Sequence, residues 1–250
     1  MTKVDHAEAP VAVVTGASAG IGGGVAQRLK EDGYRVVAVA RSPREAMQKN
    51  FDMITADVGN VDDVERLKAE VESKYGRLDA LVTCAGILAR DDGDGRLSRE
   101  KALQQIDTNL LGTINVCQTF TDMLVQSKGS AVTVSSSLAH NPQPGLGVYA
   151  ATKGAVESFT RIFATELAGH GVRVNAVRPS LVESEIWTRG GLTDEQYKNL
   201  MKERGAEYPL GRTGTARDIA GAVSFLLSPD AEWITGVVLP VDGGSGLIGR

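Results

Sequence analysis

Cysteine, aromatic residues and surplus positive charge are all scarce in this 250-residue sequence. Aromatic residues make up 5%, and 27 Lys and Arg residues face 31 Asp and Glu residues, which gives a formal net charge of −4. We therefore expect no nucleic-acid partner, because nucleic-acid-binding domains usually carry a basic excess. No stretch approaches the roughly 18 apolar residues of a membrane span, so we expect no membrane partner either.

The two cysteines, Cys84 and Cys117, match no metal-ligand spacing, and we expect no metal site. Both lie in apolar surroundings, which predicts buried, reduced thiols of the kind found in cytoplasmic proteins. The first ten residues lack a basic segment followed by an apolar run, so we expect no secretory signal.

Short apolar runs rich in β-branched residues recur along the chain, and segments with helical periodicity lie between most of them. This alternation predicts an α/β fold of the Rossmann type, a doubly wound parallel sheet of seven strands. The predicted strands are Val11–Thr15, Arg35–Ala40, Phe51–Thr55, Asp79–Thr83, Ser130–Ser135, Val172–Val177 and Gly236–Pro240.

A single sheet of this size would use the whole chain, so we predict one domain at residues 10–250 behind a flexible tail at residues 1–9. Helical runs are predicted at Val25–Asp32, Val61–Tyr75 and Ala150–Ala168. In the second of these, the predicted buried stripe comprises Val61, Val64, Leu67, Lys68 and Val71.

Two segments depart from the strand and helix alternation. One long helix is expected from near Leu97 to about Ser127. Ser184–Tyr208 forms a long, polar, helical insertion, which we expect to be a lid over the substrate.

A glycine-rich turn follows the first predicted strand directly, in the order Gly16-Ala-Ser-Ala-Gly20-Ile-Gly22. Strand, glycine turn and helix N-terminus together suit a pyrophosphate, because exposed N–H groups and the helix dipole favour negative charge. Glycine turns also occur for purely structural reasons. The spacing is G-x-x-x-G-x-G rather than the usual G-x-G-x-x-G dinucleotide fingerprint. It resembles the cofactor motif of the short-chain dehydrogenase/reductase family, which implies binding of NAD(H) or NADP(H).

The end of the second predicted strand bears on which dinucleotide is bound. NAD-binding sites typically place an acidic residue there for the ribose hydroxyl, and this chain has Ala40 followed by Arg41 and Ser42. A guanidinium matches a 2′-phosphate in charge and geometry, so NADP(H) is favoured, although NAD(H) stays possible. Ala19 departs from this pattern, since many NADP-preferring relatives carry a basic residue at that position.

A tyrosine and a lysine, Tyr149 and Lys153, stand four residues apart on a predicted helix and so project from one face. A fixed ammonium about 4–5 Å from a phenol, at an effective dielectric of about 20, favours the phenolate by roughly 3–4 kcal/mol. We therefore expect Lys153 to bring the pKa of Tyr149 toward physiological pH.

The resemblance extends to four catalytic positions. It selects Ser136 from the serine run 135–137, with Ser135 and Ser137 pointing to the other face. Tyr149 would act as general acid and base, Ser136 would orient the substrate oxygen, and Lys153 would bind the nicotinamide ribose. Asn109 would hold a water that relays protons to Lys153.

Further motifs complete the family pattern. Asp57 would bind the adenine amino group, and Thr83-Cys84-Ala85-Gly86 replaces the family's Asn-Asn-Ala-Gly. Ser180 replaces a glycine after Pro179. The resemblance implies the following cofactor-binding residues: Gly16, Ser18, Gly20, Ile21, Gly22, Arg41, Ser42, Asp57, Val58, Ala85, Gly86, Tyr149, Lys153, Pro179, Val182 and Ser184.

The substrate end of the site carries fewer motifs. Trp187 and His140 are candidates for the pocket wall, although Trp187 also suits the core and His140 a plain loop. The acidic stretch 91–95 resembles a calcium-binding loop without its final Glu, so we expect a solvated loop.

These features predict an NADP(H)-dependent enzyme that reduces a ketone or aldehyde to an alcohol, reversibly, in the cytoplasm and as a homotetramer like its relatives. A 3-oxoacyl-thioester reductase that uses an acyl carrier protein is the alternative. A non-catalytic NADP(H)-sensing protein is a third hypothesis, and the intact set Ser136, Tyr149 and Lys153 argues against it.

Overall fold

A computed structural model describes residues 9–42, 45–90, 96–141 and 143–247. The expected tail at residues 1–8 and the acidic loop at 91–95 lie outside the described residues. Ala9, which we placed in the tail, is buried. Among the described residues, no helix combines the length and the apolar character needed to cross a membrane.

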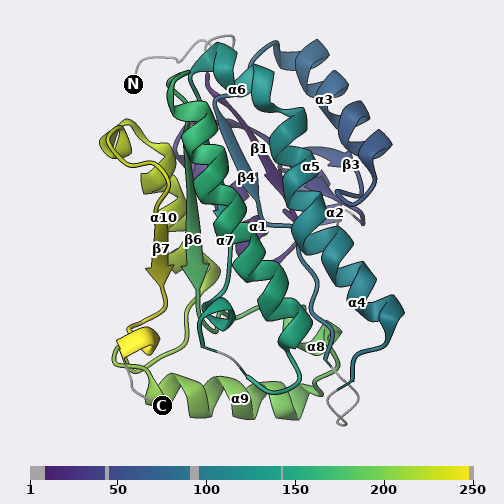
Figure 1. Cartoon of the computed structure of the whole chain (residues 1–250), viewed down its shortest axis with the longest axis vertical. Coiled ribbons are helices and arrows are strands. Elements are labelled where there is room, and N and C mark those ends of the chain that lie inside the picture. Colours follow the sequence, from purple (N-terminus) through teal and green to yellow (C-terminus); the bar gives the residue numbers. More distant parts are fainter. Residues whose placement is uncertain (1–8, 43–44, 91–95, 142, 248–250) are drawn as a thin grey trace.

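Seven parallel strands form a single sheet in the order β3-β2-β1-β4-β5-β6-β7 (Figure 1). This confirms the predicted Rossmann-type, single-domain α/β fold. The strands are β1 (Val11–Thr15), β2 (Arg35–Ala40), β3 (Asp52–Thr55), β4 (Ala80–Thr83), β5 (Ser130–Val134), β6 (Arg173–Pro179) and β7 (Val238–Val241). The first two have the predicted bounds, and the others differ by one or two residues at an end, the ordinary fraying of strand ends.

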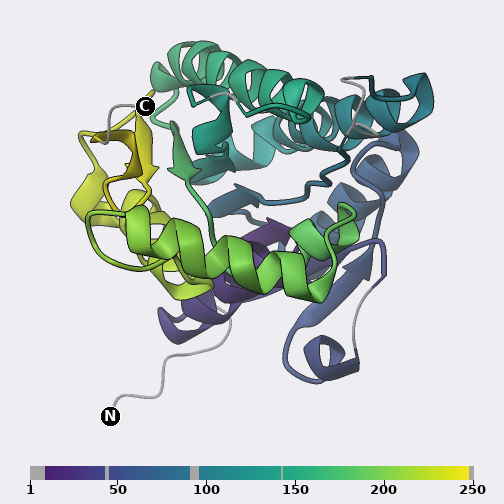
Figure 2. The same ribbon diagram turned by 90° about the horizontal axis from the view of Figure 1, so that it is seen from below.

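Helices cover both faces of the sheet, as Figure 2 shows. Residues 11 and 13 of β1 point into a core built with α3, α5, α6 and α7, whereas residues 12 and 14 point into a core built with α1 and α10. The helices are α1 (Gly20–Glu31), α2 (Glu45–Gln48), α3 (Val61–Tyr75), α4 (Arg99–Gln105), α5 (Gly112–Thr119), α6 (Thr121–Ser127), α7 (Gly147–Ala168), α8 (Ile186–Arg189), α9 (Asp194–Glu207) and α10 (Ala216–Leu227).

The long helix expected from Leu97 to Ser127 is not continuous. Between α4 and α5 the chain forms a π-helix, Ile106–Leu111, and α6 begins only after Phe120. The Thr113 hydroxyl donates to the carbonyl of Asn109, and the Thr121 hydroxyl donates to the carbonyl of Cys117. Hydroxyls that bond to carbonyls four residues back tend to bend helices. Apolar periodicity does not register such bonds, and it therefore predicted one long helix.

Helix α3 spans the predicted residues, but its buried stripe is narrower than predicted. Val64, Leu67 and Val71 are fully buried, whereas Val61 is 55% exposed because it opens the first turn, directly after the Asn60 cap. Helices α1 and α7 begin earlier than predicted, at Gly20 and Gly147, and each starts on a glycine, a residue that helical periodicity does not mark.

The predicted insertion Ser184–Tyr208 contains α8 and α9. Helix α9 begins with a capping box formed by Thr193 and Gln196, and Gly205 is its one buried residue. Figure 2 shows this helix running across the end of the molecule. The helix is therefore attached to the body of the domain with little apolar burial.

The start of α10 provides a test of local stability. Asp218 accepts hydrogen bonds from the Thr215 backbone and from both terminal nitrogens of Arg212, at 2.7–2.8 Å. The Arg212 bonds, with those from Thr215, hold the pKa of Asp218 well below its usual range despite partial burial. A carboxyl whose pKa is lower in the folded state stabilises the fold above its unfolded pKa, near 3.9, and loses that stabilisation as the pH falls.

Asp218→Asn is therefore expected to lower the free energy of unfolding at pH 7 by about 1 kcal/mol, since the pair is partly exposed. The difference from wild type should shrink as the pH falls below about 4. Urea unfolding at pH 7, 5 and 3 would measure it. The exposed Glu232→Gln serves as the control, and a difference that stays constant with pH would contradict the assignment.

Candidate active site

The carboxyl ends of the strands open onto a cavity of about 1030 Å³. The strand order reverses here, because the strands after β1 are added on one side of it and those after β4 on the other. Such a topological switch point is the usual ligand site of an open α/β sheet. The cavity is lined by all of the residues that we expected to contact a dinucleotide: Gly16, Ser18, Gly20, Ile21, Gly22, Arg41, Ser42, Asp57, Val58, Ala85, Gly86, Tyr149, Lys153, Pro179, Val182 and Ser184.

The turn at the end of β1 leaves no room for a side chain at two of its glycines. Gly16 has a φ of +67°, and a Cβ there would lie 2.8 Å from the backbone nitrogen of Ala85. A Cβ on Gly22 would lie 2.3 Å from the carbonyl oxygen of Gly16. Helix α1 then begins at Gly20 without a side-chain cap, so its first N–H groups are left for another acceptor. This cradle fits the pyrophosphate of a dinucleotide.

The turn after β4 is braced by a residue that the sequence analysis did not single out. The hydroxyl of Thr15 accepts hydrogen bonds from the backbone N–H groups of Cys84 and Ala85, each at 3.2 Å. These two bonds join the ends of β1 and β4 even though Thr83 and Cys84 replace the family's two asparagines. The backbone at Gly86 thereby lines the cavity.

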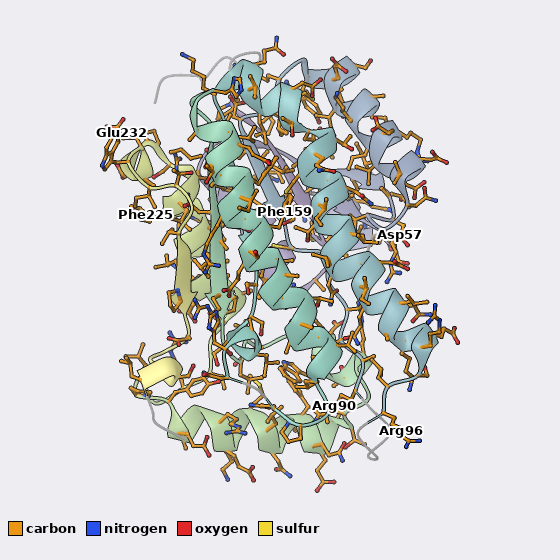
Figure 3. All side chains as sticks on the ribbon, in the orientation of Figure 1. Asp57, Arg90, Arg96, Phe159, Phe225 and Glu232 are labelled. Atoms are coloured by element: carbon orange, nitrogen blue, oxygen red, sulfur yellow. The ribbon has the colours of Figure 1, made fainter. Side chains whose placement is uncertain are left out.

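The end of the cavity beside β2 and β3 brings two predicted residues together. Nη1 of Arg41 lies 3.6 Å from Oδ2 of Asp57, and both side chains are about half-exposed. Asp57 Oδ1 also accepts the backbone N–H of Gly59 at 3.0 Å. Figure 3 shows Asp57 at the flank of the sheet, below α3.

Ser136, Tyr149 and Lys153 meet at the inner end of the cavity, and all three are buried. The Ser136 hydroxyl is close enough to the Tyr149 phenol to act on its pKa, and it also accepts the N–H of Leu138 at 3.3 Å. Nζ of Lys153 donates to the carbonyl of Val134 at 2.8 Å and lies 5.8 Å from the centre of the Tyr149 ring. The neighbouring Ser135 turns away and contacts Glu157.

The electrostatics of this group differ from our expectation. Burial raises the pKa of Tyr149 to about 12, and the Ser136 hydroxyl opposes that rise. Burial also lowers the pKa of Lys153 to about 8. The prediction that Lys153 lowers the pKa of Tyr149 is wrong for the protein without a ligand. Burial of the phenol dominates, and the ammonium of Lys153 donates to the Val134 carbonyl instead.

Asn109 lies in the π-helix and is fully buried behind the cavity. Its Oδ1 accepts the N–H of Ile87 at 2.8 Å, and its Nδ2 donates to the carbonyl of the same residue at 2.9 Å. A Cβ on Gly86 would lie 3.5 Å from Asn109 Oδ1 and 3.6 Å from Lys153 Nζ, so the two groups flank Gly86.

Two tyrosines of the insertion, absent from our candidate residues, hold the segment that follows Pro179. The hydroxyl of Tyr208 lies 2.7 Å from Ser180 Oγ and accepts the N–H of Leu181 at 3.2 Å. The hydroxyl of Tyr197 accepts the N–H of Ser184 at 3.1 Å. No motif marks these tyrosines, and only the fold brings their hydroxyls to this backbone.

The substrate candidates separate in the structure. Trp187 lines the cavity beside the apolar residues Leu88 and Ile186. His140 does not line it, and the expectation that it forms part of the pocket wall is wrong. Its Nε2 lies 2.8 Å from Oε2 of Glu157 instead, because the turn Ser137–Ala139 carries the imidazole away from the cavity.

Both thiols are free. Cys117 is buried as predicted, whereas Cys84 is only half-buried, at the cavity wall. Burial raises the pKa of each to about 12, so neither is a thiolate at neutral pH. Within the described part of the chain, no group of three or more His, Cys, Asp or Glu residues could hold a metal ion.

Comparison with known proteins identifies the family. Residues 16–246 match the family model described as enoyl-(acyl carrier protein) reductase. The 3-oxoacyl-[acyl-carrier-protein] reductase FabG of Staphylococcus aureus is 38% identical over 244 residues, which cover 93% of this chain and 96% of the relative. This chain belongs to the short-chain dehydrogenase/reductase family. It is an oxidoreductase.

Solved structures of short-chain dehydrogenases/reductases agree with this assignment. The ligand-free aldohexose dehydrogenase of Thermoplasma acidophilum has a TM-score of 0.89 at 30% identity, over 98% of this chain and 96% of that chain. The 3-ketoacyl-(acyl-carrier-protein) reductase of Brucella melitensis, complexed with NADH, has a TM-score of 0.85 at 30% identity, over 95% of this chain and 98% of that chain. A nicotinamide cofactor is therefore supported for this short-chain dehydrogenase/reductase.

Gly22→Ala is expected to weaken NADPH binding by about tenfold or more, because the added Cβ must displace the Gly16 carbonyl and distort the cradle. Fluorescence titration of NADPH would measure the Kd. Gly221→Ala is the matched control, since that helical glycine has open space around its Cβ position. Unchanged affinity in a folded Gly22→Ala variant would contradict the close approach described above.

Proposed function

We propose that this protein reduces a ketone or aldehyde to an alcohol with NADPH, in a reaction that can run in reverse. The observation that carries the proposal is that Ser136, Tyr149 and Lys153 line the same cavity as the glycine cradle. A carbonyl oxygen placed against both hydroxyls would accept two hydrogen bonds, and one of them could become a full proton transfer.

When bound, the nicotinamide supplies the hydride. Tyr149 donates its phenolic proton to the carbonyl oxygen, and Ser136 hydrogen-bonds that oxygen and fixes its position. Lys153 would bind the ribose hydroxyls of the cofactor through its ammonium. Tyr149 and Lys153 lie on the same helix, α7, which fixes the spacing and direction of their side chains.

Asn109 has a supporting role in this proposal. Its amide fixes the backbone of Ile87, and its Oδ1 lies close to Lys153 across Gly86. A water beside these groups would return a proton to Lys153, as in the relay that the resemblance implies.

The preference for NADPH over NADH rests on the end of β2. No acidic side chain follows the strand there, since Ala40 is followed by Arg41 and Ser42. The exposed guanidinium of Arg41 would form charge-assisted hydrogen bonds with a 2′-phosphate. Asp57 lies within reach of the adenine and partly neutralises Arg41 in the absence of such an anion.

Two substrate classes fit the site. A 3-oxoacyl thioester carried by an acyl carrier protein is supported by the names of the relatives and by Arg90, a cation that lines the cavity. Figure 3 shows Arg90 and Arg96 toward the lower end of the molecule. Small carbonyls or sugars are the second class, supported by the likeness to an aldohexose dehydrogenase. Intact Ser136, Tyr149 and Lys153 argue against a non-catalytic sensor.

The remaining expectations also belong to this proposal. Residues 184–208 would act as a lid, supported by the slight burial of α9. A homotetramer is supported by exposed apolar side chains such as Ile162, Phe225 and Trp233. A cytoplasmic location is supported by the two free thiols.

The proposal is tested by measuring NADPH consumption with an acetoacetyl thioester and, beside it, a panel of small ketones and diketones. Tyr149→Phe is expected to lower kcat by about a hundredfold or more, because the proton donor is lost, and to leave the Kd of NADPH within about threefold. Turnover that survives this substitution would refute the mechanism. Turnover confined to the thioester would assign the first substrate class, and turnover of small carbonyls alone the second.

Arg41→Ala is expected to lower the kcat/KM ratio of NADPH to NADH by about tenfold to a hundredfold, the value of a charge-assisted hydrogen bond. Parallel assays with the two dinucleotides would measure the ratio. Arg28→Ala, which removes an exposed cation from the far end of α1, is the control. An unchanged ratio would show that Arg41 does not select the cofactor.

A further inference from the structure

A buried carboxylate lies behind the catalytic serine and has no part in the mechanism above. Glu157 is 2% exposed and sits on α7, one helical turn beyond Lys153. An unpaired carboxylate at such a depth would be strongly destabilising. The contribution of Glu157 to stability and geometry therefore depends on the groups that bond to its carboxylate.

Partners from several elements surround the carboxylate. Oε1 accepts the hydroxyl of Ser135 at 2.8 Å and Nε of Arg178 at 3.0 Å. Oε2 lies 2.8 Å from Nε2 of His140 and 3.6 Å from Nη2 of Arg161. Burial would raise the pKa of Glu157, but the bonds from His140 and Ser135 and the charge of Arg178 hold it below its usual value. Glu157 is thus ionised at neutral pH.

The partners outside α7 lie in the segments that carry site residues, and two of them adjoin a site residue in the chain. Ser135 precedes Ser136, and its hydroxyl also lies 3.2 Å from the carbonyl of Lys153. Arg178 precedes Pro179 at the end of β6. His140 ends the short turn that begins directly after Ser136. One carboxylate therefore ties the helix of Tyr149 and Lys153 to the segments on both sides of it.

We propose that Glu157 is a positioning residue, whose carboxylate holds the segment 135–140 against α7 and so sets the Ser136 hydroxyl opposite Tyr149. This inference rests on the proposed function, because Ser136 matters only if a carbonyl oxygen is bound there. Glu157 itself touches neither the cavity nor the reacting atoms.

The geometry distinguishes positioning from simple stabilisation of the core. A buried ion pair often stabilises a fold no better than apolar residues of similar volume do. Its bonds are directional, however, and here they end on the residues next to Ser136 and Pro179. A misplacement of about 1 Å at a reacting group can cost about a hundredfold in rate.

The test compares Glu157→Leu and Glu157→Gln with Glu166→Gln, an exposed acid on the same helix. Glu157→Leu is expected to lower kcat for the carbonyl substrate by about tenfold to a hundredfold, with the Kd of NADPH changed less than about threefold. Glu157→Gln should recover part of that loss, since its amide oxygen can still accept from Ser135 and Arg178. Glu166→Gln should match wild type.

A second measurement does not depend on turnover. Hydrogen exchange in the backbone amides of residues 139–141, which bond to the carbonyls of Ser136 and Ser137, should accelerate in Glu157→Leu. Exchange in β4 should stay as in wild type. His140→Ala, which removes the imidazole donor at a half-exposed position, should accelerate the same amides and lower kcat by about threefold.

The outcomes separate the two proposals. Unchanged kcat and unchanged exchange in folded Glu157→Leu and His140→Ala would overturn the positioning role. An equal loss of kcat and of exchange protection throughout the sheet would also overturn it, as a purely structural effect. Faster exchange at residues 139–141 in a protein whose wild type reduces no carbonyl would refute the proposed function and leave the tie itself standing.

Discussion

The close contact between the turns that end β1 and β4 is the constraint on which the site depends. Gly16 meets the backbone of Ala85 with no space for a side chain, and the Thr15 hydroxyl bonds the amides of the opposing turn. Because the two turns touch, the first amides of α1 and the backbone at Gly86 face one shared cavity. The helix that carries Tyr149 and Lys153 then covers the far end of that cavity, so the glycine cradle and these two side chains share one cavity.

Much of the fold could be predicted from the sequence, for reasons visible in particular elements. Strands β1 and β2 are continuous β-branched runs that end abruptly at a glycine or at polar residues, so their bounds were predicted correctly. The π-helix at Ile106–Leu111 could not be predicted, because apolar spacing looks alike in a straight helix and a bent one. The exposure of Val61 likewise depends on its place in a helix end, which periodicity does not report.

The candidate site divides in the same way. Residues in local motifs, such as Gly16, Tyr149 and Lys153, were placed correctly because each motif is a short, continuous stretch of chain. Thr15, Glu157 and Tyr208 were missed because their partners are distant in sequence and only the fold joins them. The pKa of Tyr149 was misjudged since spacing on a helix says nothing about burial. His140 was misplaced because the turn Ser137–Ala139 directs its imidazole toward Glu157 rather than toward the cavity.

Helix α9 has a kinetic consequence that follows from how it is attached. Its anchors to the body include two tyrosine hydroxyls and the single buried Gly205, whereas the sheet beneath is packed on both faces. Local opening of such a segment costs far less free energy than global unfolding. The helix can therefore lift away and return many times during the lifetime of the native sheet. Tyr197 and Tyr208 bond the same backbone that borders the cofactor cavity, so each opening also loosens that border. In the proposed reaction, one such opening would release the product and exchange the cofactor together.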